Sequence, residues 1–150
     1  MKLSRWLISW IVLAFGLGAP AFAGLGGDVT SVEADRASLK GTVRMSAKAG
    51  VSMHEIQGAS GVLVHEYVGP DGQVFAVTWR GPGLPDLRQM LGSYYPQVQQ
   101  APSAPHYNHH HWSVRTPLVV VESSTHLRTF LGRAWAPALL PQNFSVDDIN

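Results

Sequence analysis

The chain has 150 residues, of which 11 are lysine or arginine, 10 are aspartate or glutamate and none is cysteine, and its formal net charge at pH 7 is +1. The basic residues stand singly among acidic and apolar ones, without the basic stripe on which nucleic-acid binding depends, and this argues against nucleic acid as a partner. Without cysteine the fold has no disulfide and no site for a cysteine-linked lipid, so an ordinary hydrophobic core must hold it together.

Residues 1–23 have the pattern of a cleaved signal peptide. A basic start is followed by an apolar run over 6–15, and Ala21 and Ala23 present small side chains at the two positions that a signal peptidase reads. A retained membrane anchor is the alternative, but the run is short for a bilayer and is followed by two glycines and a proline. We therefore expect cleavage after Ala23 and one domain over residues 24–150, periplasmic or secreted.

The first element predicted after the signal is a short helix from Thr30 to about Lys40. Thr30 and Glu33 match a capping box, in which each side chain accepts a hydrogen bond from the other residue's backbone N–H. Gly41 then supplies a residue able to take the left-handed conformation that commonly ends a helix.

Three strands are predicted by the period-two patterns over residues 51–57, 61–68 and 73–79. The Gly-Pro-Asp-Gly turn between the second and third pairs Gly69 with Gln73. Counting back from that pair gives a predicted core face in which Tyr67 lies opposite Phe75, His65 opposite Val77 and Leu63 opposite Trp79.

Two His-Glu pairs recur in the first two of these strands. In the simplest register across the 58–61 turn, His54 lies beside His65 on one face and Glu55 beside Glu66 on the other. His65 is then either a hydrogen-bonded core residue or half of a histidine pair that binds metal or senses pH. The two carboxylates would resemble a glycosidase pair.

The second half of the chain predicts one main helix and two strands. Pro85 and Asp86 suit the first turn of a helix that Pro96 ends. Residues 97–111, rich in histidine, proline and glutamine, predict an exposed loop, and strand patterns follow over 112–124 and 126–136. The expected fold is α+β: an antiparallel sheet of about five strands with one main helix packed on it and a short N-terminal helix.

Histidines crowd the end of the 97–111 loop. Adjacent residues of an extended chain point to opposite sides, so His109 and His111 can share one metal ion, with His106 as a third ligand if the loop curls. Zinc, nickel or copper would suit such ligands. The alternative, which we favour, is a polar surface loop without a specific metal or other cofactor.

No catalytic motif stands in the sequence: it has no Gly-x-Ser-x-Gly elbow, no His-Glu-x-x-His and no glycine-rich phosphate loop. We therefore expect a non-enzymatic binding or accessory protein that works beside another cell-envelope protein. A metal-binding protein and an unrecognised hydrolase are the alternatives. The expected contact surface is a sheet edge or the corner of Trp79, Arg80 and Pro82; the alternative is that Trp79 is core and Pro82 only shapes the turn.

The runs over residues 24–41 and 54–95 resemble a family of exported bacterial proteins described as a domain of unknown function (DUF2844). The most specific part is the stretch from His65 through the Gly-Pro-Asp-Gly turn to "VFAVTWRGPGLPDLRQMLGSYY". Here His65 stands where the family pattern often has arginine, which argues against an essential role for it, and Met90 stands where leucine is common. The resemblance implies a small exported domain of Gram-negative bacteria and brings no catalytic residue or cofactor.

Overall fold

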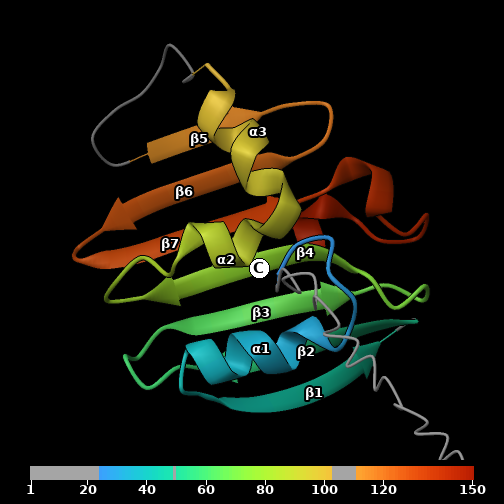
Figure 1. The fold of residues 1–150 in the computed structure, drawn as a ribbon, viewed down its shortest axis with the longest axis horizontal. Coiled ribbons are helices and arrows are strands. Elements are labelled where there is room, and N and C mark those ends of the chain that lie inside the picture. Colours follow the sequence, from blue (N-terminus) through green and yellow to red (C-terminus); the bar gives the residue numbers. More distant parts are fainter. Residues whose placement is uncertain (1–23, 49, 103–110) are drawn as a thin grey trace, which may run out of the picture.

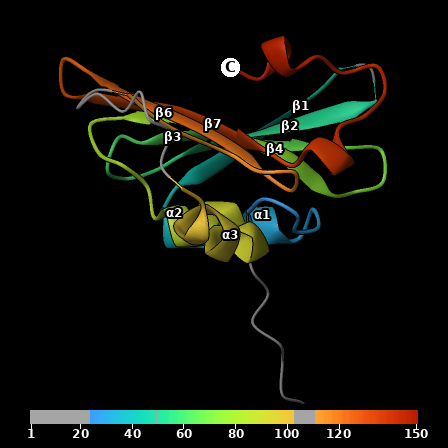
Figure 2. The same cartoon turned by 90° about the horizontal axis from the view of Figure 1, so that it is seen from above.

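A computed structural model describes residues 24–48, 50–102 and 111–150. These residues form one antiparallel sheet with a helical layer on one of its faces (Figures 1 and 2). The strands are β1 (Thr42–Lys48), β2 (Val51–Gln57), β3 (Leu63–Val68), β4 (Val74–Gly81), β5 (His111–Arg115), β6 (Val120–His126) and β7 (Thr129–Trp135). The α-helices are α1 (Ser31–Ser38), α2 (Leu87–Leu91) and α3 (Tyr95–Gln100), and the short 3-10 helices are η1 (Gly92–Tyr94), η2 (Pro137–Leu139) and η3 (Val146–Asp148).

The strand order is β1-β2-β3-β4-β7-β6-β5. The chain builds one half of the sheet as a meander, crosses the sheet through α2, η1 and α3, and returns from the far edge, so that β7 pairs with β4 in the middle (Figure 1). The α+β class and the antiparallel sheet are therefore as predicted, but the sheet has seven strands rather than about five. One extra strand is β1, where Val43, Met45 and Ala47 alternate with polar residues, a period-two pattern from which a strand could have been predicted.

The other extra strand arises because the predicted 112–124 strand is two strands. Thr116 breaks it: the Thr116 hydroxyl accepts from the backbone N–H of Val119 at 2.9 Å and donates to the Val119 carbonyl at 3.0 Å. The following turn also lies later than the Ser-Ser-Thr sequence suggests. It is formed by Leu127 and Arg128, which both have positive φ. A two-residue hairpin turn needs positive φ at both residues if its twist is to match the right-handed twist of the strands.

The β3–β4 hairpin contains a β-bulge that the sequence did not predict. Gly69 does donate to Gln73, at 2.9 Å, but Val68 then pairs with Val74 while Tyr67 pairs with Ala76, so Phe75 is an extra residue. Beyond the bulge the predicted register is wrong by one residue. His65 therefore lies opposite Thr78, not Val77, and Leu63 opposite Arg80 instead of Trp79.

The bulge decides which side chains share a face, because a shift of one residue reverses a strand's faces. On the face under the helices, Val64 and Glu66 accompany Val77 and Trp79, whereas the predicted core residues Leu63, His65 and Tyr67 lie on the opposite face. The β2–β3 register differs too: His54 is opposite Glu66 and Glu55 is opposite His65. The predicted His54–His65 and Glu55–Glu66 pairs do not exist.

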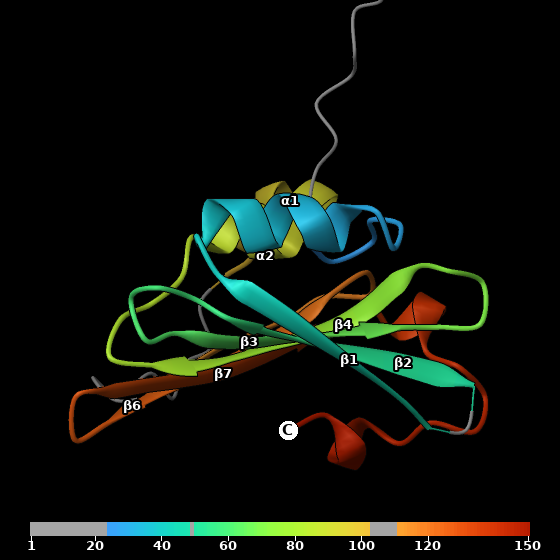
Figure 3. The same ribbon diagram turned by 90° about the horizontal axis from the view of Figure 1, so that it is seen from below.

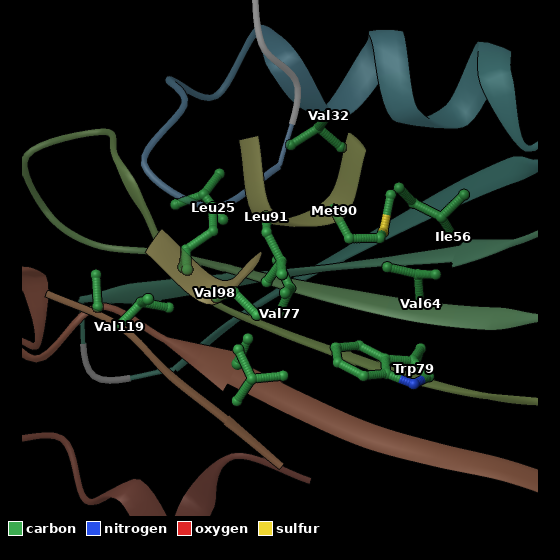
Figure 4. Close-up of a cluster of buried hydrophobic side chains, with 14 of the residues drawn as sticks. Leu25, Val32, Ile56, Val64, Val77, Trp79, Met90, Leu91, Val98 and Val119 are labelled. Atoms are coloured by element: carbon green, nitrogen blue, oxygen red, sulfur yellow. The ribbon is translucent and has the colours of Figure 1, made fainter. Parts of the chain in front are cut away.

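The two faces of the sheet carry separate cores. The helix face holds the larger one, packed between the helices and the strands (Figure 4); its labelled members include Val32, Ile56, Val64, Trp79, Met90 and Leu91. The C-terminal segment, residues 137–150, crosses the other face, which we call the tail face (Figures 2 and 3). There Tyr67, Phe75, Trp135 and Ile149 form the second core.

Helix boundaries differ from the sequence prediction at two places. The Thr30–Glu33 capping box does not form, because the Asp28 carboxylate accepts from the backbone N–H of Thr30 at 2.8 Å and Glu33 pairs with Arg36. Pro96 does not end the helical segment; it stands in the first turn of α3, where a missing N–H costs nothing, so the predicted loop starts as helix.

Two side chains cap other helix starts. Asp86 accepts from the backbone N–H of Arg88 at 2.9 Å at the start of α2. Near the C-terminal end Ser145 accepts from the N–H of Asp147 at 3.2 Å.

Candidate functional site

A row of polar side chains crosses the tail face from one edge of the sheet to the other. Each member is the direct cross-strand partner of the next, and such partners lie on the same face of a sheet. One residue comes from each strand, and in spatial order the row is Arg44, Glu55, His65, Thr78, Arg133, Glu122 and Ser113. The tail face is therefore a charged band between apolar patches.

Glu122 and Arg133 form an ion pair within this row. The Glu122 carboxylate accepts from Nε of Arg133 at 2.9 Å, lies 2.9 Å from its Nη2, and also pairs with Arg115. The Arg133 guanidinium lies 5.3 Å from the Trp135 ring centre as well, a cation–π distance. The guanidinium is thus fixed on three sides.

Two members of the row, together with Tyr67, contact main-chain oxygens of the C-terminal segment. Arg133 Nη1 donates to the carbonyls of Val146 and Ile149, at 3.2 and 3.4 Å. The Tyr67 hydroxyl donates to the main-chain oxygen of Asn150 at 2.8 Å, and His65 Nδ1 lies 3.0 Å from that oxygen. A main-chain oxygen can only accept, so Nδ1 of His65 carries the proton.

A groove of about 410 Å³ opens beside the C-terminal segment, over the part of the row that the segment does not cover. Ile149 and Asn150 line one side of it. Part of its floor is formed by three residues of the row: Thr78, Arg133 and Glu122. A second set of cross-strand partners runs parallel to the row and completes the floor: Arg80, Leu131, Ser124 and His111. We call this the tail-side groove, and it is the candidate binding site.

The structure separates the three residues of the predicted contact corner. Trp79 lies in the helix-face core with 2% of its surface exposed, in line with the alternative that it is a packing residue. Arg80 is exposed and lines both the tail-side groove and a neighbouring hollow of about 380 Å³. Pro82 is exposed in that second hollow, so the two remaining residues of the corner lie beside the groove.

The predicted metal ligands are only partly placed. His111 is exposed, opens β5 and lines the tail-side groove, while His106 and His109 lie outside the described residues. Within residues 24–48, 50–102 and 111–150, no three histidine, aspartate or glutamate side chains are grouped to hold a metal ion. The loop-histidine metal site stays a prediction.

An acidic pair on the helix face was missed by the sequence reasoning. Asp35 of α1 and Glu66 of β3 are both fully buried, and Gln89 of α2 donates to Asp35 at 2.6 Å while its own oxygen accepts from Ser38 at 2.5 Å. Two ionised carboxylates cannot hydrogen-bond each other, and both Glu66 oxygens otherwise lack a partner among the described residues. A proton on Glu66 removes the conflict by letting it donate to Asp35.

The electrostatics of this pair agree with that arrangement. Burial, followed by the hydrogen bond and the charge of Asp35, raises the pKa of Glu66 to about 10. Burial also raises the pKa of Asp35, against the hydrogen bonds that stabilise its ionised form. Beside Glu66, burial lowers the pKa of His54, which keeps that imidazole neutral. The pair therefore holds α1 to the sheet as a neutral or singly charged unit.

The fold and the groove together define a small α+β domain whose sheet is covered by helices on one face and partly by its own C-terminal segment on the other. Residues 21–149 match the family described as "Protein of unknown function (DUF2844)", and the chain belongs to that family, as the sequence resemblance indicated. No curated protein and no solved structure matches the chain. Among the described residues no helix has the length and apolarity to cross a membrane.

Proposed function

We propose that this protein is an exported, non-enzymatic binding protein of the cell envelope, and that it holds its partner in the tail-side groove. The observation that carries the proposal is the composition of the groove: four strands, β4, β7, β6 and β5, each contribute a polar or charged side chain to one concave surface of about 410 Å³. A concave site with a few fixed polar groups on rigid strands is the usual form of a binding pocket.

The rigidity of the groove supports binding rather than general surface polarity. Arg133 and Glu122 are fixed by each other, by Arg115 and by the main chain of the C-terminal segment. Donors and acceptors that are already positioned lose little conformational entropy when a ligand arrives. Export is supported by the signal-peptide pattern of residues 1–23.

Site-specific photo-crosslinking in cells that make the protein with its own N-terminus tests the binding site. A photoreactive residue at Ser124, in the groove, should give a defined crosslinked species in the envelope fraction. The same residue at Ala34, exposed on α1 in the helical layer, is the matched control and should give none. Equal crosslinking from both positions, or from neither, would contradict the proposed site.

Export has a separate test in the same cells. The protein recovered from the envelope fraction should begin at Gly24, which N-terminal sequencing can establish. Protein that keeps residues 1–23 and stays in the cytoplasmic fraction would rule export out, whatever the groove binds.

A further inference from the structure

We infer that the tail-side groove takes an acidic peptide segment and that Arg80 anchors one of its carboxylates. This inference rests on the proposed function, because it names the partner chemistry of the same groove. Three features of the tail face support it: its existing peptide contacts, its charge and its layout.

The tail face already binds peptide. Its side chains contact the C-terminal segment through main-chain oxygens, with no side-chain oxygen of the segment involved. The contacts are made by Arg133 to Val146 and Ile149, and by Tyr67 and His65 to Asn150. Contacts of this kind hold a peptide main chain whatever its side chains are, here at and just after the 3-10 turn η3. The groove begins where these contacts stop, at Ile149 and Asn150, and the same row continues along its floor.

The charge of the groove selects an acidic segment. Among the described lining side chains, the charged ones are Arg80 and Arg133 against one acid, Glu122. Glu122 is shared by Arg115 and Arg133, so its one negative charge faces two guanidinium groups. No ion pair joins Arg80 to another of the described residues, and Arg128 lines the adjoining hollow with it. The surplus of positive charge favours a carboxylate ligand.

The layout of the groove suits a side chain that ends in a carboxylate. Leu131 lies between Arg80 and Ser124 in the second cross-strand set, so an aliphatic stem has an apolar contact next to a guanidinium. The planar guanidinium can hold both oxygens of one carboxylate at once. Ser124 and His111 lie further along the same floor as polar contacts for the rest of the segment.

Fluorescence anisotropy with two labelled peptides, both with blocked ends, tests the inference on the purified protein. The probes are a six-residue glutamate peptide and a glutamine peptide of equal length. We expect the glutamate peptide to bind at least about tenfold more tightly at low salt. Arg80→Ala should weaken that binding about tenfold, and added salt should weaken it further. Arg88→Ala, on the opposite layer at α2, is the matched control and should leave binding unchanged.

Either of two results overturns the inference: equal affinity for the two peptides, or an Arg80→Ala protein that melts like the wild type and still binds the glutamate peptide as the wild type does. The Ser124 crosslinks distinguish this failure from that of the proposed function. If they persist in cells while the glutamate peptide does not bind, the ligand chemistry is wrong and the groove remains the site. If they are absent too, both proposals fail.

Discussion

The two faces of the sheet are covered in opposite ways. Under the helices the sheet presents a nearly continuous apolar surface, and the two carboxyl groups buried there, Glu66 of β3 and Asp35 of α1, have pKa values raised by burial. Under the C-terminal segment it presents a band of ion pairs that stay partly exposed and hold the segment by hydrogen bonds. Burial and shape hold the first layer, whereas directional polar contacts hold much of the second.

The contrast between the two faces explains why the candidate ligand site lies on the tail face. A closely packed apolar face has no donors or acceptors to offer without losing its core. A face built from paired charges keeps them near water, so a ligand can share them at little cost. This is why the candidate site lies on the tail face although the larger core lies on the other.

The largest expected effect comes from disturbing the packing of the helix face. Gly132 lies opposite Trp79, and a Cβ at Gly132 would come within 2.2 Å of the indole. Gly132→Ala should therefore lower the free energy of unfolding by about 3 kcal/mol, through displacement of Trp79. Urea denaturation measures this free energy of unfolding. Gly83→Ala, where a Cβ meets no atom within 4 Å, is the control and should shift stability by less than about 0.5 kcal/mol; equal losses would contradict the packing argument.

A smaller effect, visible as pH dependence, should come from Glu66→Gln. Because the folded-state pKa of Glu66 is raised to about 10, the folded state holds more protons than the unfolded state above pH 4.5. The contribution of Glu66 to stability is therefore greatest in acid and declines as the pH rises from about 4.5 towards 10. The glutamine variant lacks this decline and should be more stable than the wild type by about 2 kcal/mol at pH 8 and by less at pH 5.

Denaturation at the two pH values, with Glu55→Gln as the tail-face control, checks this prediction. Glu55 is partly exposed on the other face, so its variant should change stability by less than about 1 kcal/mol. A Glu66→Gln protein that loses the same stability at both pH values would show that a proton on Glu66 is not what the acidic pair requires.

The smallest effect is expected on the tail face from Tyr67→Phe. The variant loses the hydroxyl that donates to Asn150, which should cost about 1 kcal/mol. Hydrogen exchange should quicken at residues 146–150 and stay unchanged in α1, because only the C-terminal segment is loosened. Tyr95→Phe is the control, because the Tyr95 hydroxyl accepts from the exposed side chain of Gln99, away from the tail face. Faster exchange throughout the chain would mean that the two layers are not independent.

Local sequence signals predicted the local structure well. The Gly69 turn, a helix start at Asp86 and the strand pattern of β2, β3 and β4 are all present, because each depends on neighbours in the chain. The bulge was hidden, since Val74 to Val77 are all buried and a run that is apolar on both faces shows no alternation from which a shift can be detected.

The candidate site depended on contacts that no local pattern encodes. Arg80 and His111 were singled out from the sequence, but their neighbours Arg133 and Glu122 reach the groove only because β7 pairs with both β4 and β6. The burial of Glu66 was missed for the same reason. The predicted register placed Glu66 on the face opposite the predicted core, whereas the observed register turns it towards the helices. The helix α1 that covers Glu66 is distant from it in the sequence.

The bulge at Phe75 also governs how the chain tolerates changes in length. Phe75 is the residue without a cross-strand partner, so deleting it would leave Val77 and Trp79 facing the helices as before. It would also remove a fully buried ring from the tail-face core, with its contacts to Phe144 and Tyr67 at centroid distances of 4.9 and 6.1 Å. Deleting any one residue between Ala76 and Trp79 would instead exchange the two faces from that point on. Arg80 would then point into the helix-side core. Loss of one codon at the bulge would thus cost one buried aromatic side chain but keep the two faces distinct, whereas the same loss a few positions later would exchange them.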